Sequence, residues 1–163
     1  MNAPVDAGML SRHDGPEGLA AEVSPPVAAD LADVLDWLAA QFIRAPQREQ
    51  VHAARSVVGQ MLLREMGDVL GNETLMARLG RHLSEGTEEE VTEALQRRYT
   101  ALFEGVFSRQ CALPYASAWQ GSGRLYDAPV TRMQKLLQTL CMELAPTNHE
   151  PADHLAVQLA ALA

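Results

Sequence analysis

Apolar residues recur at helical spacing along almost the whole chain from residue 31 onward. The first run, Leu31 to Phe42, follows the i, i+3, i+4, i+7 pattern and has Asp30 as its N-cap. The second run is expected to form one long helix from Pro46 to Val69. Gly59 inside it costs about 1 kcal/mol relative to alanine, so it predicts a close helix crossing.

Further helices are predicted by their end signals. Asn72 caps a short helix that Gly86 ends, and Thr87 with Glu90 forms a capping box at the start of the next. Asp127 starts a helix that runs to Leu144. The last helix is expected to have Pro151 in its first turn and Leu155, Leu159 and Leu162 on one face.

These patterns predict an all-α fold, a single-domain bundle of about six or more helices, because no useful strand alternation or internal repeat occurs. Residues 1–27 are rich in Ala, Gly, Pro and acidic side chains and are expected to be a disordered tail, which leaves 28–163 as the domain. The segment from Ser108 to Tyr126 is expected to be irregular, and long irregular segments in helical domains are usually functional.

Composition limits the classes of partner. The chain has 163 residues and a formal net charge of −8, which disfavours nucleic acid and anionic membranes and favours basic partners, although acidity also serves solubility alone. Cys111 and Cys141 have no C-x-x-C spacing, so no zinc or redox pair and no cofactor are expected. No secretory signal or spanning segment is visible, which predicts a cytoplasmic protein.

Catalytic patterns are weak. Ser117 is not in a G-x-S-x-G elbow, and the glycines near it lack the lysine of a phosphate loop, so no enzyme is expected. The remaining catalytic alternative is a metal-dependent enzyme using His149, Asp153 and His154. The two histidines are not at the i, i+4 spacing of a helical metal site, which argues against it.

The stretch from Glu150 to His154 has two physical interpretations. Asp153, if it faced a groove, would attract an arginine-bearing peptide through charge-assisted hydrogen bonds. Alternatively, Glu150 and Asp153 are ordinary acids at a helix start and His154 is a structural residue. The residues alone leave both interpretations open.

Three motifs occur in an order that resembles the TorD/DmsD/NarJ-like redox-enzyme maturation chaperones. The motifs are Tyr99-x-x-Leu102-Phe103-x-Gly105, Leu113-Pro114-Tyr115-Ala116-Ser117-Ala118-Trp119 and Glu150-Pro151-Ala152-Asp153-His154-Leu155. The third motif is the most specific, and the resemblance extends over about residues 31–163. One departure is Ala116, where the family often has an acidic residue.

The resemblance implies a helical bundle that catalyses no reaction. It implies binding to the twin-arginine signal peptide, or to the apo form, of a molybdopterin-dependent oxidoreductase in the cytoplasm until cofactor insertion. By resemblance, the client-binding residues are Asp153, His154, Pro151, Glu150, Trp119, Ser117, Tyr126 and Phe103. It also implies helices beyond residue 163 and either a monomer or a domain-swapped homodimer, which would cover the last leucines. A general helical interaction module remains the alternative.

Overall fold

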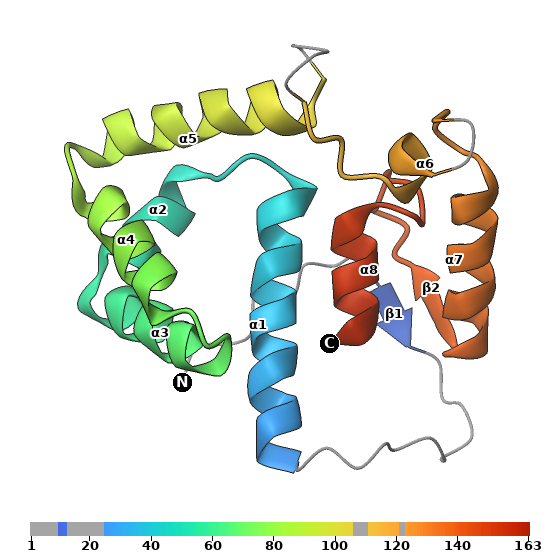
Figure 1. Ribbon diagram of the computed structural model, residues 1–163, viewed down its shortest axis with the longest axis horizontal. Helices are drawn as coiled ribbons and strands as arrows, with labels where there is room; N and C mark the ends of the chain where they lie inside the picture. The colour runs from blue at the N-terminus through green and yellow to red at the C-terminus, as the bar shows by residue number, and fades with distance from the viewer. Residues whose placement is uncertain (1–9, 13–24, 106–110, 121–122) are drawn as a thin grey trace. The chain divides into compact units, whose positions relative to one another are not determined.

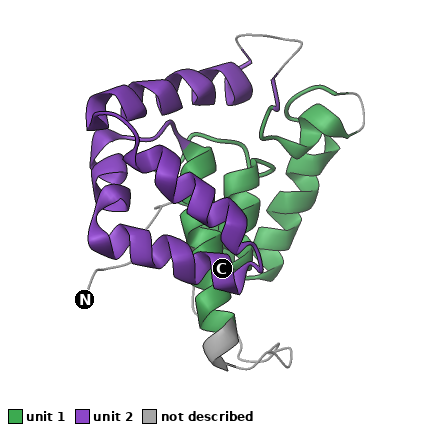
Figure 2. Ribbon diagram, turned by 60° about the vertical axis from the view of Figure 1, so that its left-hand side comes forward, with its two compact units in different colours: residues 1–43, 113–163 green, residues 44–112 purple. Residues whose placement is uncertain are grey.

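The computed structural model describes residues 10–12, 25–105, 111–120 and 123–163, and Figure 1 shows its helices and strands. Helices dominate the described residues and strands are almost absent from them, which confirms the predicted all-α class. The chain divides into two compact units, shown in Figure 2: residues 1–43 with 113–163, and residues 44–112.

Unit 1 contains α1 (Pro25–Ile43), the short α6 (Ala116–Trp119), α7 (Ala128–Thr139) and α8 (Leu155–Leu162). α8 lies along α1, as Figure 1 shows, and Ala39 and Ala156 are completely buried where the two helices meet. Small side chains at this position allow close approach of the helix backbones. A second cluster, which includes Val130, Leu137 and Val157, joins α7 to α8.

Two short strands complete unit 1. β1 (Leu10–Arg12) pairs antiparallel with β2 (Met142–Leu144), with Leu10 opposite Leu144 and Ser11 opposite Glu143. Leu10 packs against both core clusters of the unit. Neither strand was predicted, because three residues are too few to establish an alternating pattern. Of the rest of the predicted tail, residues 1–9 and 13–24 lie outside the described residues, whereas residues 25–27 belong to α1.

Unit 2 contains α2 (Arg48–Arg55), α3 (Val57–Val69), α4 (Glu73–Ser84) and α5 (Glu88–Phe103). The predicted caps are present: the Asn72 side chain accepts from the Leu75 N–H, and Thr87 and Glu90 form a capping box. α2 is joined to α5 by Glu88, whose two carboxylate oxygens contact Arg48 and His52 at 2.7 Å. The hydrogen bonds from these two side chains lower the pKa of Glu88.

Four helix boundaries differ from the prediction. The first helix begins at Pro25, so Asp30 lies inside α1 and is not its N-cap. The long second helix is interrupted at Ser56, which ends α2 and caps α3; its Oγ accepts from the Gly59 N–H. Gly59 marks the close crossing expected of it, because a Cβ there would collide with Ala53 and Ala54. The predicted helix to Leu144 ends at Thr139 and gives way to β2, and the last helix starts at Leu155 rather than at Pro151.

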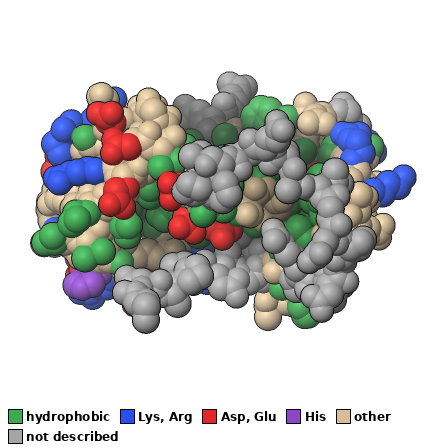
Figure 3. Space-filling view, turned by 90° about the horizontal axis from the view of Figure 1, so that it is seen from below, with side chains coloured by type: hydrophobic (Ala, Val, Ile, Leu, Met, Phe, Trp, Pro, Cys, Tyr) green, Lys and Arg blue, Asp and Glu red, His purple; other side chains and the backbone are tan. Residues whose placement is uncertain are grey.

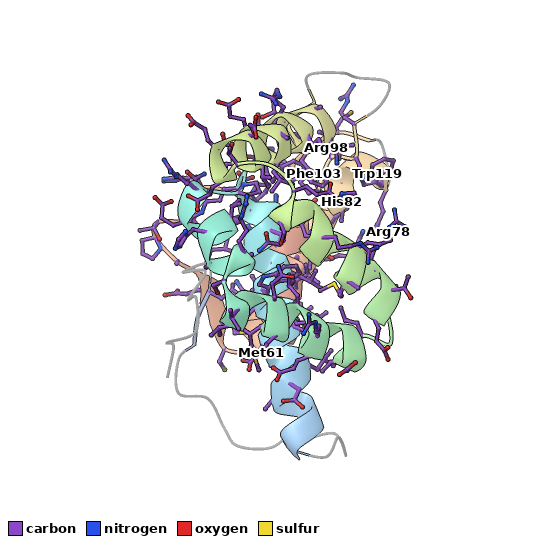
Figure 4. The ribbon with its side chains drawn as sticks, turned by 90° about the vertical axis from the view of Figure 1, so that its left-hand side faces the viewer. Met61, Arg78, His82, Arg98, Phe103 and Trp119 are labelled. Atoms are coloured by element: carbon purple, nitrogen blue, oxygen red, sulfur yellow. The ribbon has the colours of Figure 1, made fainter. Side chains whose placement is uncertain are left out.

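In α3, the residues that are buried are not those of its apolar stripe. Val58, Met61 and Leu62 line one apolar face of the helix, but these side chains are about half exposed. Leu63 and Gly67 are buried instead, and Gly67 lies against α4 at Glu73 and Met76. Figure 3 shows hydrophobic side chains on the surface at the left of the view, on the side where Figure 1 places α3; Met61 is labelled in Figure 4.

Candidate functional site

The third motif is joined to the second by backbone hydrogen bonds in unit 1. Tyr115 and His154 form an isolated antiparallel bridge. The Ala116 N–H donates to the Asp153 carbonyl at 3.1 Å, and the Leu155 N–H donates to the Pro114 carbonyl at 2.7 Å. Two segments almost forty residues apart in the sequence are thus held side by side at the start of α8.

Asp153 forms the central side-chain contact between these segments. It is 1% exposed, and its Oδ2 accepts from the Ser117 N–H at 2.7 Å. The Gln158 side chain donates to its backbone carbonyl at 2.8 Å. Asp153 Oδ1 and the Ser117 hydroxyl are buried with no hydrogen-bond partner in the structure. Unpaired buried polar atoms are costly, so this carboxyl oxygen is an acceptor that still lacks a donor.

His154, which follows Asp153 in the chain, makes contacts that stabilise the start of α8. It is the N-cap of α8 and is 2% exposed, with Nδ1 accepting from the Ala156 N–H at 3.0 Å. Its ring meets the edge of the Tyr115 ring, with 5.0 Å between centroids. Burial lowers the pKa of His154, and the charges of Glu150 and Asp153 only partly oppose this. The folded protein therefore favours the neutral imidazole, which the cap requires.

Glu150 and Pro151 shape the approach to α8. The Tyr115 hydroxyl donates to Glu150 Oε2 at 2.8 Å, and the Glu150 N–H donates to the Asn148 side chain at 2.9 Å. The Pro151 carbonyl accepts from the His154 N–H at 3.0 Å, which closes a turn before the helix. Glu150 is thus a hydrogen-bond partner of the second motif and lies outside α8.

A pocket of about 180 Å³ opens beside Asp153 in unit 1. Its lining residues come from α6, α7 and the start of α8: Ala116, Gln120, Pro129, Arg132, Met133, Leu136, Asp153 and Gln158. Arg132 donates to Gln120 Oε1 at 2.7 Å on its exposed side. The pocket therefore combines an apolar wall with two amide side chains, one guanidinium and the buried carboxyl group. This combination suits a side chain with an apolar stem and a hydrogen-bond-donating end.

The structure brings together five of the predicted site residues. These are Ser117, Glu150, Pro151, Asp153 and His154, all in the two hydrogen-bonded segments. Asp153 and His154 are buried, however. His154 matches the structural interpretation because it caps α8, whereas Asp153 lies before the helix and accepts from Ser117. The expectation that both bind a client stays a prediction.

The three predicted aromatic residues lie elsewhere. Trp119 is 69% exposed, and its Nε1–H donates to the Leu113 carbonyl at 2.7 Å. Tyr126 is 72% exposed and has a φ of 64°, in the left-handed region. Phe103 belongs to unit 2, near the end of α5 (Figure 4), where its ring meets that of Tyr99 at 5.2 Å. None of the three lines the pocket.

Sequence reasoning missed four polar residues of this region: Tyr115, Gln120, Arg132 and Gln158. Arg132 could have been found, because it lies at i+3 from Pro129 and shares a helical face with Leu136. Gln158 could have been found one turn after His154. Tyr115 belongs to the second motif, which could have drawn attention to it, whereas Gln120 carries no such signal because its position depends on the pairing of two distant segments.

The metal alternative lacks a cluster of ligands. Among the described residues, no group of three or more His, Cys, Asp or Glu side chains is placed to hold a metal ion. His149 is exposed, whereas Asp153 and His154 are buried, so the three proposed ligands do not share an environment. In the same described part of the chain, no helix has the length and apolarity needed to cross a membrane.

Comparisons with known proteins give consistent matches. The family described as "Nitrate reductase delta subunit" matches residues 68–163. The chain is 29% identical over 136 residues to "Chaperone protein TorD" of Vibrio cholerae serotype O1 and 28% identical over 132 residues to that of Vibrio atlanticus. These alignments cover 81% and 78% of this chain and 60% of each relative, so the chain spans about three fifths of their length.

A solved structure is also similar. It is that of a proposed redox enzyme maturation protein from Archaeoglobus fulgidus, with 20% sequence identity and a TM-score of 0.47. The alignment covers 90% of this chain and 75% of that one.

Proposed function

Because the chain belongs to the nitrate reductase delta subunit family, we propose that it is a maturation chaperone for a molybdopterin-dependent oxidoreductase. Membership confirms the resemblance drawn from the three motifs. In this proposal the protein acts in the cytoplasm, as a monomer or a domain-swapped homodimer, and catalyses no reaction. It binds the twin-arginine signal peptide of its client, or the apo form of the catalytic subunit, until the cofactor is inserted.

The observation that carries the proposal is the unpaired Oδ1 of Asp153, a residue that lines a pocket with apolar walls. An arginine side chain has an apolar stem and a guanidinium that donates up to five hydrogen bonds, so it fits this combination. The pocket of about 180 Å³ is much larger than the roughly 10–15 Å³ that one water requires. An entering arginine would give Oδ1 the partner that it lacks in the structure.

The distribution of charge also supports a basic ligand. Unit 1 carries 11 of the 21 acidic residues but only 4 of the 13 Lys and Arg, whereas unit 2 is almost balanced. Nearly the whole net charge of −8 therefore belongs to the unit that contains the pocket. Such a field attracts a basic segment and increases its rate of association, with a strong dependence on salt.

The experiment compares two peptides. A twin-arginine signal peptide and its Lys-Lys variant are titrated against the wild type and against Asp153→Asn. We expect the wild type to prefer the arginine peptide by roughly 10-fold, since one or two charge-assisted hydrogen bonds differ. Asp153→Asn should remove most of this preference while keeping the fold. Equal binding of the two peptides to the folded wild type, or no binding at all, would refute the proposal.

A second candidate function rests on α3. Its exposed apolar stripe favours a general helical interaction module that binds a partner through Val58, Met61 and Leu62. Such a module would ignore arginine and would lose its partner when Met61 and Leu62 are changed to polar residues. Peptide binding that depends on these two residues, and not on Asp153, would favour this candidate over the chaperone.

A further inference from the structure

The pocket beside Asp153 offers hydrogen-bond acceptors on its α8 side. The side-chain nitrogen of Gln158 donates to the backbone carbonyl of Asp153 at 2.8 Å. A carbonyl group only accepts hydrogen bonds, so the amide nitrogen of Gln158 must face it and the amide oxygen remains available as an acceptor. Oδ1 of Asp153 is a second acceptor without a donor. The α8 side of the pocket therefore suits a group that donates hydrogen bonds.

The rim formed by α6 and α7 has the opposite character. Gln120 follows α6, Arg132 lies on α7, and a hydrogen bond of 2.7 Å joins Nη2 of Arg132 to Oε1 of Gln120. A guanidinium only donates hydrogen bonds, so the amide oxygen of Gln120 must face it and the amide nitrogen remains a donor. Both side chains are exposed, whereas Asp153 is buried. The rim therefore presents donors and a positive charge.

Arg132 is a cation without a carboxylate partner in the described part of the chain. Its hydrogen bond goes to the neutral amide of Gln120, and no ion pair joins it to Asp153, although both residues line the pocket. This is unexpected in unit 1, where acidic residues outnumber Lys and Arg by 11 to 4. Because the pocket lies between the guanidinium and the carboxyl group, a ligand with a donor at one end and an anion at the other can contact both.

The wall between these two sides is apolar and fixes the orientation of such a ligand. It is formed by Ala116 of α6 and by Pro129, Met133 and Leu136 of α7. An arginine can lay its methylene stem on this wall with its guanidinium toward the acceptors of the α8 side. An inserted acid would place its carboxylate among those acceptors, so the anionic group of the ligand belongs at the rim.

We propose that Arg132 is a specificity-determining residue of this pocket, and that it selects client segments with an Asp or Glu two positions from the inserted arginine. The inference rests on the proposed function for the entry of an arginine into the pocket. Side chains alternate along an extended chain, so residues two positions apart lie on one face, about 7 Å from each other. In a pair of arginines the second one then points away from the pocket, and the acidic side chain accepts hydrogen bonds from Arg132.

The test uses blocked five-residue peptides with a central arginine and two residues X, which stand either at both ends or directly on both sides of the arginine, with alanine elsewhere. X is Glu in one pair of isomers and Lys in another, so the members of a pair have the same composition and net charge. Dissociation constants are measured by NMR titration of the full chain at an ionic strength of about 0.15 M, at which charges farther away than about 8 Å are largely screened.

The comparison within each pair isolates the contact at the rim. We expect the wild type to bind the Glu isomer with X at the ends roughly 3- to 10-fold more tightly than the other Glu isomer, since it gains a charge-assisted hydrogen bond to Arg132. In Arg132→Gln the two Glu isomers should bind equally. In Arg132→Glu the Lys isomer with X at the ends should bind more tightly than the other Lys isomer.

Lys135 provides the matched control. It is an exposed residue of α7 that does not line the pocket, so Lys135→Gln removes the same charge and should keep the wild-type preference. Circular dichroism checks that each variant is folded, and Arg132→Gln alone decides if Arg132→Glu does not fold. Equal binding of the two Glu isomers to the wild type, no binding of either, or a preference that persists in Arg132→Gln overturns the proposal.

The outcome separates this inference from the proposed function. If the wild type binds the twin-arginine peptide in preference to its Lys-Lys variant but binds the two Glu isomers equally, the selection by Arg132 is wrong and the chaperone function stands. If the isomers behave as expected but no twin-arginine peptide binds, the selectivity of the pocket stands and the client assignment is wrong.

Discussion

The contact between Asp153 and Ser117 gives the sharpest prediction for stability. In Asp153→Ala, the Ser117 N–H loses the acceptor that it contacts at 2.7 Å and is left in a fully buried position. The bonds that Ala116 and Gln158 donate to the backbone carbonyl of residue 153 do not depend on its side chain. The substitution therefore removes one buried hydrogen bond and the packing of one carboxyl group.

The magnitude follows from these two losses. A buried donor without a partner costs about 1–3 kcal/mol, and lost packing adds to it, so we expect a loss of about 2–4 kcal/mol in the free energy of unfolding. For a chain of this length, 1 kcal/mol shifts the melting temperature by roughly 2–4 °C, so a decrease of roughly 5–15 °C is expected. This loss would appear in a binding assay as weaker binding even if Asp153 never touched a client.

Asp153→Asn is the control that separates the two roles. Its amide oxygen can still accept from the Ser117 N–H, so we expect a loss of about 1 kcal/mol or less. Thermal and urea unfolding, followed by circular dichroism, measure both variants against the wild type. A melting temperature of Asp153→Ala within about 2 °C of the wild type would refute the structural role assigned here. Equal destabilisation by Asp153→Asn and Asp153→Ala would show that the lost stability does not come from the hydrogen bond to Ser117.

Three further predictions concern single residues. Burial lowers the pKa of His154, so the neutral imidazole contributes its full stability above the ordinary imidazole value near pH 6.5, and this contribution is lost as the pH falls through the folded-state pKa. Urea unfolding should therefore show that the free energy of unfolding falls more steeply at acid pH in the wild type than in His154→Asn. Parallel pH profiles would contradict this. Gly59→Ala should lower the free energy of unfolding by about 2 kcal/mol more than Gly67→Ala does, because the new Cβ meets backbone atoms of α2. Equal melting temperatures of the two variants would argue against a close crossing of α2 and α3 at Gly59. Cys141 has a φ of 54°, in the left-handed region, so Cys141→Val should lower the melting temperature of the protein and Cys141→Gly should not. A lower melting temperature for the Gly variant than for the Val variant would exclude backbone strain at this position.

The sequence by itself determined the local structure and the family. Helix starts are set by side chains within three residues of each other, so Asn72 and the Thr87–Glu90 capping box were predicted correctly without knowledge of the fold. The order of the three motifs was sufficient to identify the family. The all-α class followed from apolar periodicity, which depends only on helix geometry.

Tertiary structure decided what each motif residue contacts. Helical spacing could not show that Asp153 would turn inward to Ser117, because that contact joins residues 36 positions apart. The same limit applies to β1, whose pairing with β2 depends on a chain reversal of more than a hundred residues. In α3, the sequence shows which residues are apolar but not which of them are buried. Periodicity identifies an apolar stripe, but only packing decides whether Leu63 and Gly67 or Met61 and Leu62 are buried, since all four lie on one short helix with apolar side chains on both faces.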